Sequence, residues 1–492
     1  MNKYAKTSIQ LNLLSVVIGF INNVFEFSSS FLFIEILTLV SGIYSSLIIL
    51  HLPTTRFNFL LISSAIISLG SSLGILNTFY SVELFTDSSW YSLLLNANVT
   101  DNDIIVGQIY INAFCASLTI FGLLLQNTGS VDSVYEKSLL CLKRSKTLIY
   151  VVISVLLIEL YLIYTGDIVF GGISLGDAQK IANPLMGVTP LFAIMPIWCG
   201  YNLISFRLSK LYHLKNIVLI LSLTANLYYF FTNGRRMIVF YFILILIGYF
   251  FDKPLSYQVI RKNIILIVIG CFISVQISNV YNKLRLIKGY SFVQEQGILS
   301  TLQKIDESDN RGFSEANLSN VATRTSYSSI SFAYFVTVIE KYDKILYGKI
   351  LKNSFLNATP SDWFVDKSTV LIQERLYMEE YPINILDISD SIYLESMIDF
   401  KYLGVLIYPA FLFIVLLILY KCINTNNTNS FLLGASMVLM ALSMIETGTT
   451  TFITTVRIII VCFPIVRIGE IIRNTAYSKN PKGSTGYSEL SI

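Results

Sequence analysis

Two adjacent arginines, Arg235 and Arg236, follow a glycine in the stretch TNGRRMIVFY, which lies between two apolar runs. They stand at the start of an expected helix, where the helix dipole already presents partial positive charge and mildly disfavours a cation. Free backbone N–H groups and two guanidinium groups at one helix end can together bind a phosphate group. The alternative is that both side chains reach the lipid headgroups as interfacial anchors.

Further ionisable residues lie inside apolar runs. Arg457, in FITTVRIIIVCF, is a few residues inside the last run, where a lone charge costs about 2.5–3.5 kcal/mol on insertion scales and marks a functional candidate. Glu446 could be its partner in a purely structural ion pair. The acids Glu35 and Glu159 also lie within apolar runs, in the same half of the membrane as the arginines. This placement predicts a polar cavity that opens on one side of the membrane.

A polar segment late in the chain carries the remaining candidates. It contains a turn-rich stretch, then a semi-apolar stretch that is expected to be helical and to lie on the membrane or cap a cavity. The charged residues that we expect near a site in this segment are Arg324, Arg375, Asp390 and Glu395.

The elements that must position these residues are transmembrane helices. Of the 492 residues, 54% are hydrophobic and 13% are charged, and the mean hydropathy is +0.64, which is far from an average soluble domain. The sequence predicts an all-α, polytopic membrane protein with about twelve transmembrane helices of about 20 residues each and a large outer loop late in the chain. The expected spans are residues 7–25, 31–51, 58–79, 104–125, 147–165, 186–204, 216–232, 237–251, 263–279, 402–420, 431–446 and 453–472.

The positions of lysine and arginine predict the orientation, because cytoplasmic loops keep an excess of both. With the N-terminus inside, the cytoplasmic segments collect most of them and the short outer loops hold almost none, apart from the opening arginine pair. Both termini are then cytoplasmic. The net charge of +4 is explained by this asymmetry, so we expect no nucleic-acid partner. The expected parts are helices 1–9 in 1–279, the outer loop in 280–401, helices 10–12 in 402–472 and a cytoplasmic tail in 473–492.

The order of these features resembles a known family. TNGRRMIVFYFILILIGYF is similar to a Gly-Ser/Thr-Arg turn before an apolar span, and ATRTSYSSISFAYFVTVIEKYDKILYGK to an arginine before a helix that ends in Tyr-Asp and Gly. TPSDWFVDK, YLESMIDFKYLGVL and TTVRIIIV follow in the expected order. Over residues 216–470 the chain therefore resembles the O-antigen and capsular polysaccharide repeat-unit polymerases of the Wzy type, and the first 200 residues match in hydropathy alone.

The resemblance implies a glycosyltransferase on the outer face of a bacterial inner membrane, with undecaprenyl-diphosphate-linked oligosaccharides and membrane lipid as its partners. A chain-length regulator is a further candidate partner. A diphosphate leaving group needs pre-placed cations, and Arg235, Arg236, Arg324 and Arg457 are expected on the correct side. We expect no cofactor and no metal, because the outer segments have no Gly-rich phosphate loop and no cluster with metal-ligand spacing.

Removal of a proton from an acceptor hydroxyl needs a carboxylate or an imidazole. The two histidines, His51 and His213, fall in expected cytoplasmic loops. Glu395 is therefore the preferred general base and Asp390 the second candidate. The alternative for Glu395 is an ion pair with Lys401 or a loop arginine.

Two other functions remain open from the sequence. A lipid-linked oligosaccharide flippase would also have about twelve spans, but it needs polar residues on both leaflets and has no use for a large outer loop. An O-antigen ligase shares the lipid donor and relies on an outer-face histidine, which the expected topology does not provide. A non-catalytic envelope protein would leave the buried arginines without a role.

Overall fold

The computed structural model describes most of the chain, and every statement below concerns these residues. They are 3–25, 31–80, 99–144, 146–165, 167–168, 184–203, 205, 213–254, 258–259, 261–265, 268–270, 272–273, 276–277, 331–359, 373–381, 391–423, 426–445 and 447–478.

The described residues form helices and no strands. Seven of the described helical segments are long and apolar enough to cross a membrane, and three shorter apolar helices accompany them. The chain is thus an all-helical protein with the helices of a membrane-embedded protein, as the composition predicted. Our count of about twelve spans and the extent of the outer loop stay predictions.

The chain divides into two compact units. The first unit contains residues 1–129, 282–417 and 440–454, and the second contains 130–281, 418–439 and 455–492. Each unit is described separately below.

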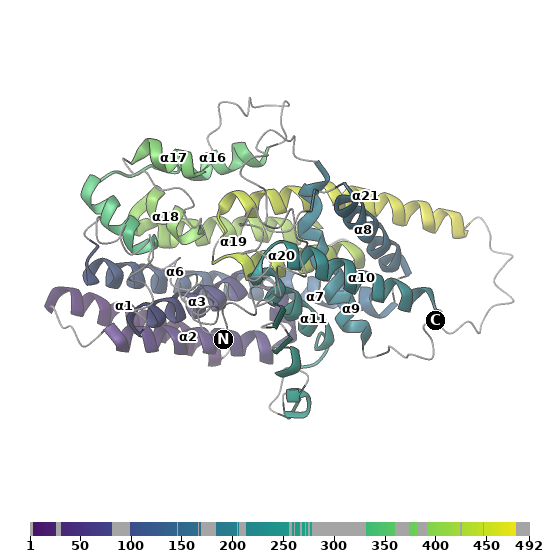
Figure 1. Cartoon of the computed structure of the whole chain (residues 1–492), viewed down its shortest axis with the longest axis horizontal. Coiled ribbons are helices and arrows are strands. Elements are labelled where there is room, and N and C mark those ends of the chain that lie inside the picture. Colours follow the sequence, from purple (N-terminus) through teal and green to yellow (C-terminus); the bar gives the residue numbers. More distant parts are fainter. Residues whose placement is uncertain are drawn as a thin grey trace, which may run out of the picture. The chain divides into compact units, whose positions relative to one another are not determined.

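Four long helices form the first part of the first unit. They pack side by side (Figure 1) because small residues allow their backbones to approach. A Cβ on Gly42 of α2 would lie 2.9 Å from Leu69 of α3, and a Cβ on Gly122 of α6 would lie 2.9 Å from Leu61. These helices are α1 (Lys3–Phe25), α2 (Phe31–His51), α3 (Phe59–Tyr80) and α6 (Asp101–Asn127), with the 3₁₀ turn η2 (Pro53–Phe57) before α3.

Shorter helices from later in the sequence complete the first unit. Helix 331–342 packs on α6, where a Cβ on Gly107 would lie 3.1 Å from Phe332. Its apolar residues are mostly buried, so it belongs to the core of the unit. The remaining elements are α16 (Lys349–Ala358), α17 (Gln373–Glu380), α18 (Ile392–Phe400), η6 (Lys401–Leu403) and the first part of α19 (Gly404–Ile423).

The second unit is built around two helices in very close contact. A Cβ on Gly200 of α9 (Ile194–Leu203) would lie 2.1 Å from the carbonyl oxygen of Ile245 in α11 (Arg235–Tyr249). A Cβ on Gly248 would lie 2.1 Å from the carbonyl oxygen of Ile197, so only glycine fits at both positions. The other elements are α7 (Ser130–Arg144), α8 (Lys146–Tyr164), η3 (Pro184–Ala193), α10 (Leu214–Thr232), most of α20 (Asn427–Ser443) and most of α21 (Thr449–Ser478).

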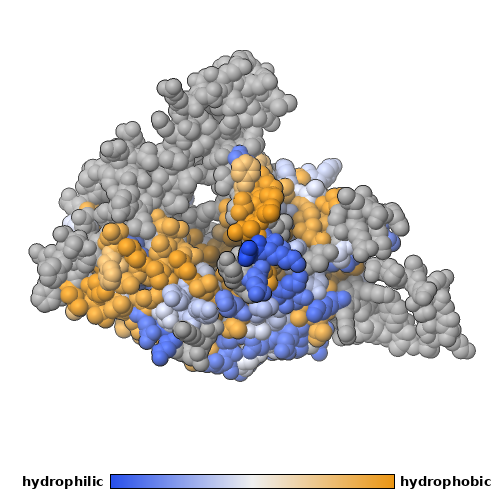
Figure 2. All heavy atoms as spheres, turned by 90° about the horizontal axis from the view of Figure 1, so that it is seen from below, coloured by the Kyte–Doolittle hydropathy of each residue, from blue (hydrophilic) through white to orange (hydrophobic). Residues whose placement is uncertain are grey.

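Large apolar side chains remain exposed along the long helices. Val17 and Phe20 of α1 are 54% and 66% exposed, and Ile414 and Ile418 of α19 are 54% and 57% exposed. In Figure 2, hydrophobic residues cover much of the visible described surface and hydrophilic residues gather in separate areas. Such apolar surface is unusual for a soluble monomer and fits helices that contact lipid.

Candidate functional site

The preferred base, Glu395, lies on a short buried helix. Helix α18 begins after Ser391, whose hydroxyl accepts the Leu394 N–H at 3.4 Å. It ends at Phe400, because the next residue, Lys401, has a φ of +46°, which lies outside the helical region. Eight of the nine residues of α18 are buried. Glu395 and Asp399 are four residues apart and share one face of this helix.

Glu395 binds the beginning of another helix. Its two carboxylate oxygens accept the Thr449 N–H at 3.0 and 2.9 Å, and the Thr449 hydroxyl also donates to the carboxylate. Thr449 is the first residue of α21, so the negative charge stands at the positive end of that helix. The carboxylate satisfies a backbone N–H group that has no partner within α21 itself.

Asp399 has the same role for α16. Its Oδ1 accepts the Ile350 N–H at 3.0 Å and its Oδ2 accepts the Leu351 N–H at 3.0 Å. The Tyr408 hydroxyl donates to Oδ2 at 2.7 Å. Gly348 precedes α16 with φ +83°, a left-handed conformation that glycine adopts at no steric cost. The two acids of α18 therefore each bind the N-terminus of a different helix.

Helix α18 also contacts α6 and the start of α19, and the groups in these contacts are uncharged. Tyr110 of α6 and Ser396 of α18 are joined by a hydrogen bond of 2.7 Å between their hydroxyl groups. A Cβ on Gly404 would lie 2.1 Å from the Ser396 carbonyl oxygen and 2.5 Å from the Tyr110 hydroxyl. The start of α19 can approach this pair so closely because residue 404 has no side chain.

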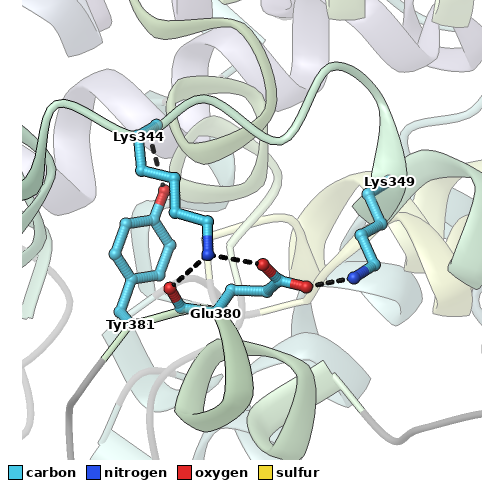
Figure 3. Close-up of polar contacts among 4 residues, drawn as sticks. All are labelled: Lys344, Lys349, Glu380 and Tyr381. Atoms are coloured by element: carbon cyan, nitrogen blue, oxygen red, sulfur yellow. Dashed lines mark hydrogen bonds and ion pairs between the residues drawn. The ribbon is translucent and has the colours of Figure 1, made fainter.

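A charged cluster lies beside α16 (Figure 3). The Glu380 carboxylate binds Lys344 at 2.7 Å and also Lys349, the first residue of α16. The Tyr381 hydroxyl donates to the Lys344 carbonyl oxygen at 3.0 Å. Hydrogen bonds from the two lysines lower the pKa of Glu380 below its ordinary value. This cluster fixes the end of α17 against the start of α16.

Lys401 does not pair with Glu395. It binds Asp343 instead, and the pKa of that exposed carboxyl group is lowered by the hydrogen bond and by the charge of the lysine. The partner that we considered for Glu395 is therefore engaged by another residue. The other alternative, a loop arginine, concerns residues that include Arg324, which lies outside the described residues.

The predicted arginines and the second base are described in part. Arg235 and Arg236 begin α11, after Gly234 with φ +118°, and the structure describes the backbone of these two residues. Arg457 is half-buried in the third turn of α21. The three arginines belong to the second unit, whereas Glu395 belongs to the first. Three of the candidate residues from the sequence, Arg324, Asp390 and Glu446, lie outside the described residues.

The contact with Thr449 was missed by the sequence reasoning. The stretch ETGTTTF combines a glycine and threonines before an apolar run, which is a usual helix start. This pattern predicts that a helix begins there and says nothing about which distant acid binds its N-terminus. Asp399 was expected on the face of Glu395, but its binding to α16 had no local signal.

The chain matches no protein-family model, and comparisons with curated proteins and with solved structures find no similar protein. The membrane class of the chain therefore rests on its helices, and its function is argued from residues alone.

Proposed function

We propose that the chain is a membrane glycosyltransferase that polymerises oligosaccharide repeat units linked to undecaprenyl diphosphate, at the outer face of a bacterial inner membrane. The observation that carries the proposal is the buried Glu395 carboxylate, fixed by Thr449 on a short helix of an apolar protein. A fixed carboxylate in a site with little water is an oriented proton acceptor. The role that we give to the arginines is inferred from the sequence pattern alone.

The proposed reaction transfers one glycan. The acceptor hydroxyl oxygen of the next repeat unit forms a bond to the anomeric carbon of the growing glycan, and its proton moves to Glu395. The bond between that carbon and the diphosphate oxygen breaks, and its electron pair leaves with undecaprenyl diphosphate. Guanidinium groups at the diphosphate stabilise the charge that develops there. Arg235, Arg236, Arg324 and Arg457 are the residues that we assign to this role.

Replacement of Glu395 by glutamine tests the base. Glu395→Gln keeps the shape and can still accept the Thr449 N–H, but it cannot take a proton at neutral pH. Loss of a general base is expected to lower the rate by about 10²–10⁴, so single lipid-linked repeat units should accumulate. The measurement is gel analysis of surface polysaccharide together with extraction of the lipid-linked intermediates.

Thr449→Val is the matched control for this experiment. It removes the hydroxyl that binds Glu395 and leaves both the carboxylate and its contact with the Thr449 N–H, so polymerisation should fall much less than in Glu395→Gln. Normal polymer from Glu395→Gln together with loss from Asp390→Asn would assign the base to Asp390. Normal polymer from both variants would contradict a base at either position.

The arginine pair has its own test. Arg235→Ala and Arg236→Ala should strongly reduce polymerisation at unchanged protein abundance, because a charged hydrogen bond contributes about 1.5–3 kcal/mol. Lysine at either position should restore part of the activity, since an ammonium group cannot bind phosphate in the bidentate geometry of arginine. Arg261→Ala, at an exposed position, is the control. Normal polymer from both alanine variants would favour interfacial anchoring.

A flippase is the second candidate. It is favoured by the buried Glu35 in the first unit and the buried Glu159 in the second, because ionisable residues inside the membrane also mark transport pathways. Deletion of the gene separates the two functions. A polysaccharide ladder that collapses to the core plus one repeat unit indicates a polymerase. Loss of that single unit as well indicates a flippase or a ligase.

A further inference from the structure

A buried column of polar side chains runs between α1, α2 and α6. The Thr38 hydroxyl donates to Asn112 Oδ1 at 3.0 Å, and the Gln108 Nε2 donates to the same Oδ1 at 3.2 Å. The Asn112 Nδ2 donates to the Ser15 hydroxyl of α1. The column continues along α1 and α2 through hydroxyl contacts of Ser8 with Ser45 at 2.6 Å and with Ser41 at 3.1 Å.

One carboxyl group belongs to this column. Glu35 of α2 is fully buried, and it precedes Thr38 by three residues, so the two side chains share a face of the helix. Among the described residues, neither carboxylate oxygen of Glu35 has a hydrogen-bond partner. The same holds for both polar atoms of the Asn12 side chain and for Oε1 of Gln108, and these two residues are also fully buried.

These unpartnered atoms are mostly acceptors. Glu35 offers two oxygens, Asn12 offers Oδ1 and Gln108 offers Oε1, against one unused donor, the Asn12 Nδ2. Buried polar groups in proteins almost always have partners, so each such atom calls for a ligand. A buried ionised carboxylate without a counter-charge is very unfavourable, and the group is neutralised instead. One bound positive charge would neutralise the carboxylate and interact with acceptor oxygens that have no donor.

None of the described residues near Glu35 supplies this charge. No lysine or arginine forms an ion pair with Glu35 among the described residues. On the elements packed against α2, the described cations lie far from the level of Glu35. Lys3 and Lys6 are in the first two turns of α1, near Ser8, which contacts Ser45 at the other end of α2. Arg56 of η2 donates to the Leu50 carbonyl oxygen at 3.4 Å. The other ionisable groups of these helices are acids, tyrosines, a cysteine and the histidine that ends α2. They are Tyr4, Tyr44, His51, Tyr80, Asp101, Asp103, Tyr110 and Cys115.

We propose that Glu35, with Gln108, forms a buried site for one monovalent cation, a proton or Na⁺, in the polar column between α1, α2 and α6. A proton neutralises the carboxylate and makes it the donor of one hydrogen bond to a free acceptor oxygen, whereas Na⁺ neutralises it and takes the free acceptor oxygens as ligands. The hydroxyls from Ser41 to Ser45 extend the polar lining along α2, towards the end of the helix where the Tyr4 hydroxyl lies 3.5 Å from His51. This site lies outside the proposed polymerase machinery and does not depend on it.

Infrared spectroscopy of the purified full-length protein tests the proposal. The spectrum of the wild type minus that of Glu35→Gln isolates the Glu35 carboxyl group. If the cation is a proton, this difference contains the C=O band of a neutral carboxylic acid at neutral pH, equally in sodium chloride and in choline chloride. If the cation is Na⁺, sodium removes that band, or raises the Tm of the wild type above its value in choline at equal ionic strength.

Two further variants keep the result interpretable. Glu159→Gln removes the buried glutamate of the second unit and should leave the Glu35 band and any sodium effect unchanged. Glu35→Asp keeps a carboxyl group and should shift the band. This variant identifies the band if Glu35→Gln does not fold. A spectrum without an acid band from residue 35 in either salt, together with equal Tm values in sodium and choline, would overturn the proposal.

Discussion

Replacement of Asp399 by alanine is expected to destabilise the first unit strongly. The substitution leaves three donors without their acceptor, namely the N–H groups of Ile350 and Leu351 and the hydroxyl of Tyr408. Each buried donor without a partner costs about 1–3 kcal/mol. The sum is about 3–9 kcal/mol, and we expect a value near its lower end because water can enter the space that alanine leaves. This is a large fraction of the stability of a typical domain, about 5–15 kcal/mol.

Two variants separate the contributions. Tyr408→Phe removes one donor and leaves Asp399 bound to both backbone groups, so it should cost about 1 kcal/mol. The loss of stability in Asp399→Asn should lie between those of Tyr408→Phe and Asp399→Ala. The asparagine keeps one acceptor oxygen, but its NH₂ group faces a backbone N–H that needs an acceptor. The assays are thermal unfolding of the purified protein in detergent and hydrogen exchange of the first turn of α16. The reasoning is refuted if Asp399→Ala unfolds no earlier than Tyr408→Phe, or if exchange in α16 is unchanged.

Three further predictions concern other parts of the chain. The lowered pKa of Glu380 means that its ion pairs stabilise the fold fully above the unfolded value of 4.5 and cease to do so as the pH falls through the lowered native pKa. Glu380→Gln should therefore flatten the loss of stability with acid in a pH series of unfolding temperatures. Gly200→Ala places a Cβ 2.1 Å from a carbonyl oxygen of α11 and should cost about 1–3 kcal/mol in the same assay. Gly270→Ala should cost little, because among the described residues no atom of another segment lies within 4 Å of the added Cβ. For the topology, in a cysteine-free background, cysteine at Ser308 should react with an impermeant maleimide from the outside and cysteine at Ser209 should not; the reverse result would invert the proposed orientation.

The sequence by itself determined the helical membrane class of the protein. Apolar runs of membrane-spanning length are a property of consecutive residues, so composition alone indicates where many of the helices form. The start of α11 at Arg235 was also predicted, because a glycine turn between two apolar runs is a local signal. The same runs predict that Glu35 and Glu159 lie within membrane spans, whereas their burial against neighbouring helices is a result of the packing.

Only the tertiary structure decided what the buried acids bind. Glu395 and Thr449 are 54 residues apart in the sequence, and Asp399 and Ile350 are 49 residues apart. The carboxylates and the helix starts are each recognisable locally, but any acid could bind any free helix N-terminus. The pairs are selected by the packing of α18 between its neighbours, which brings Gly404 against Ser396 and fixes the face that carries both acids. Such packing depends on close fits between distant segments, and no short stretch of the chain encodes it.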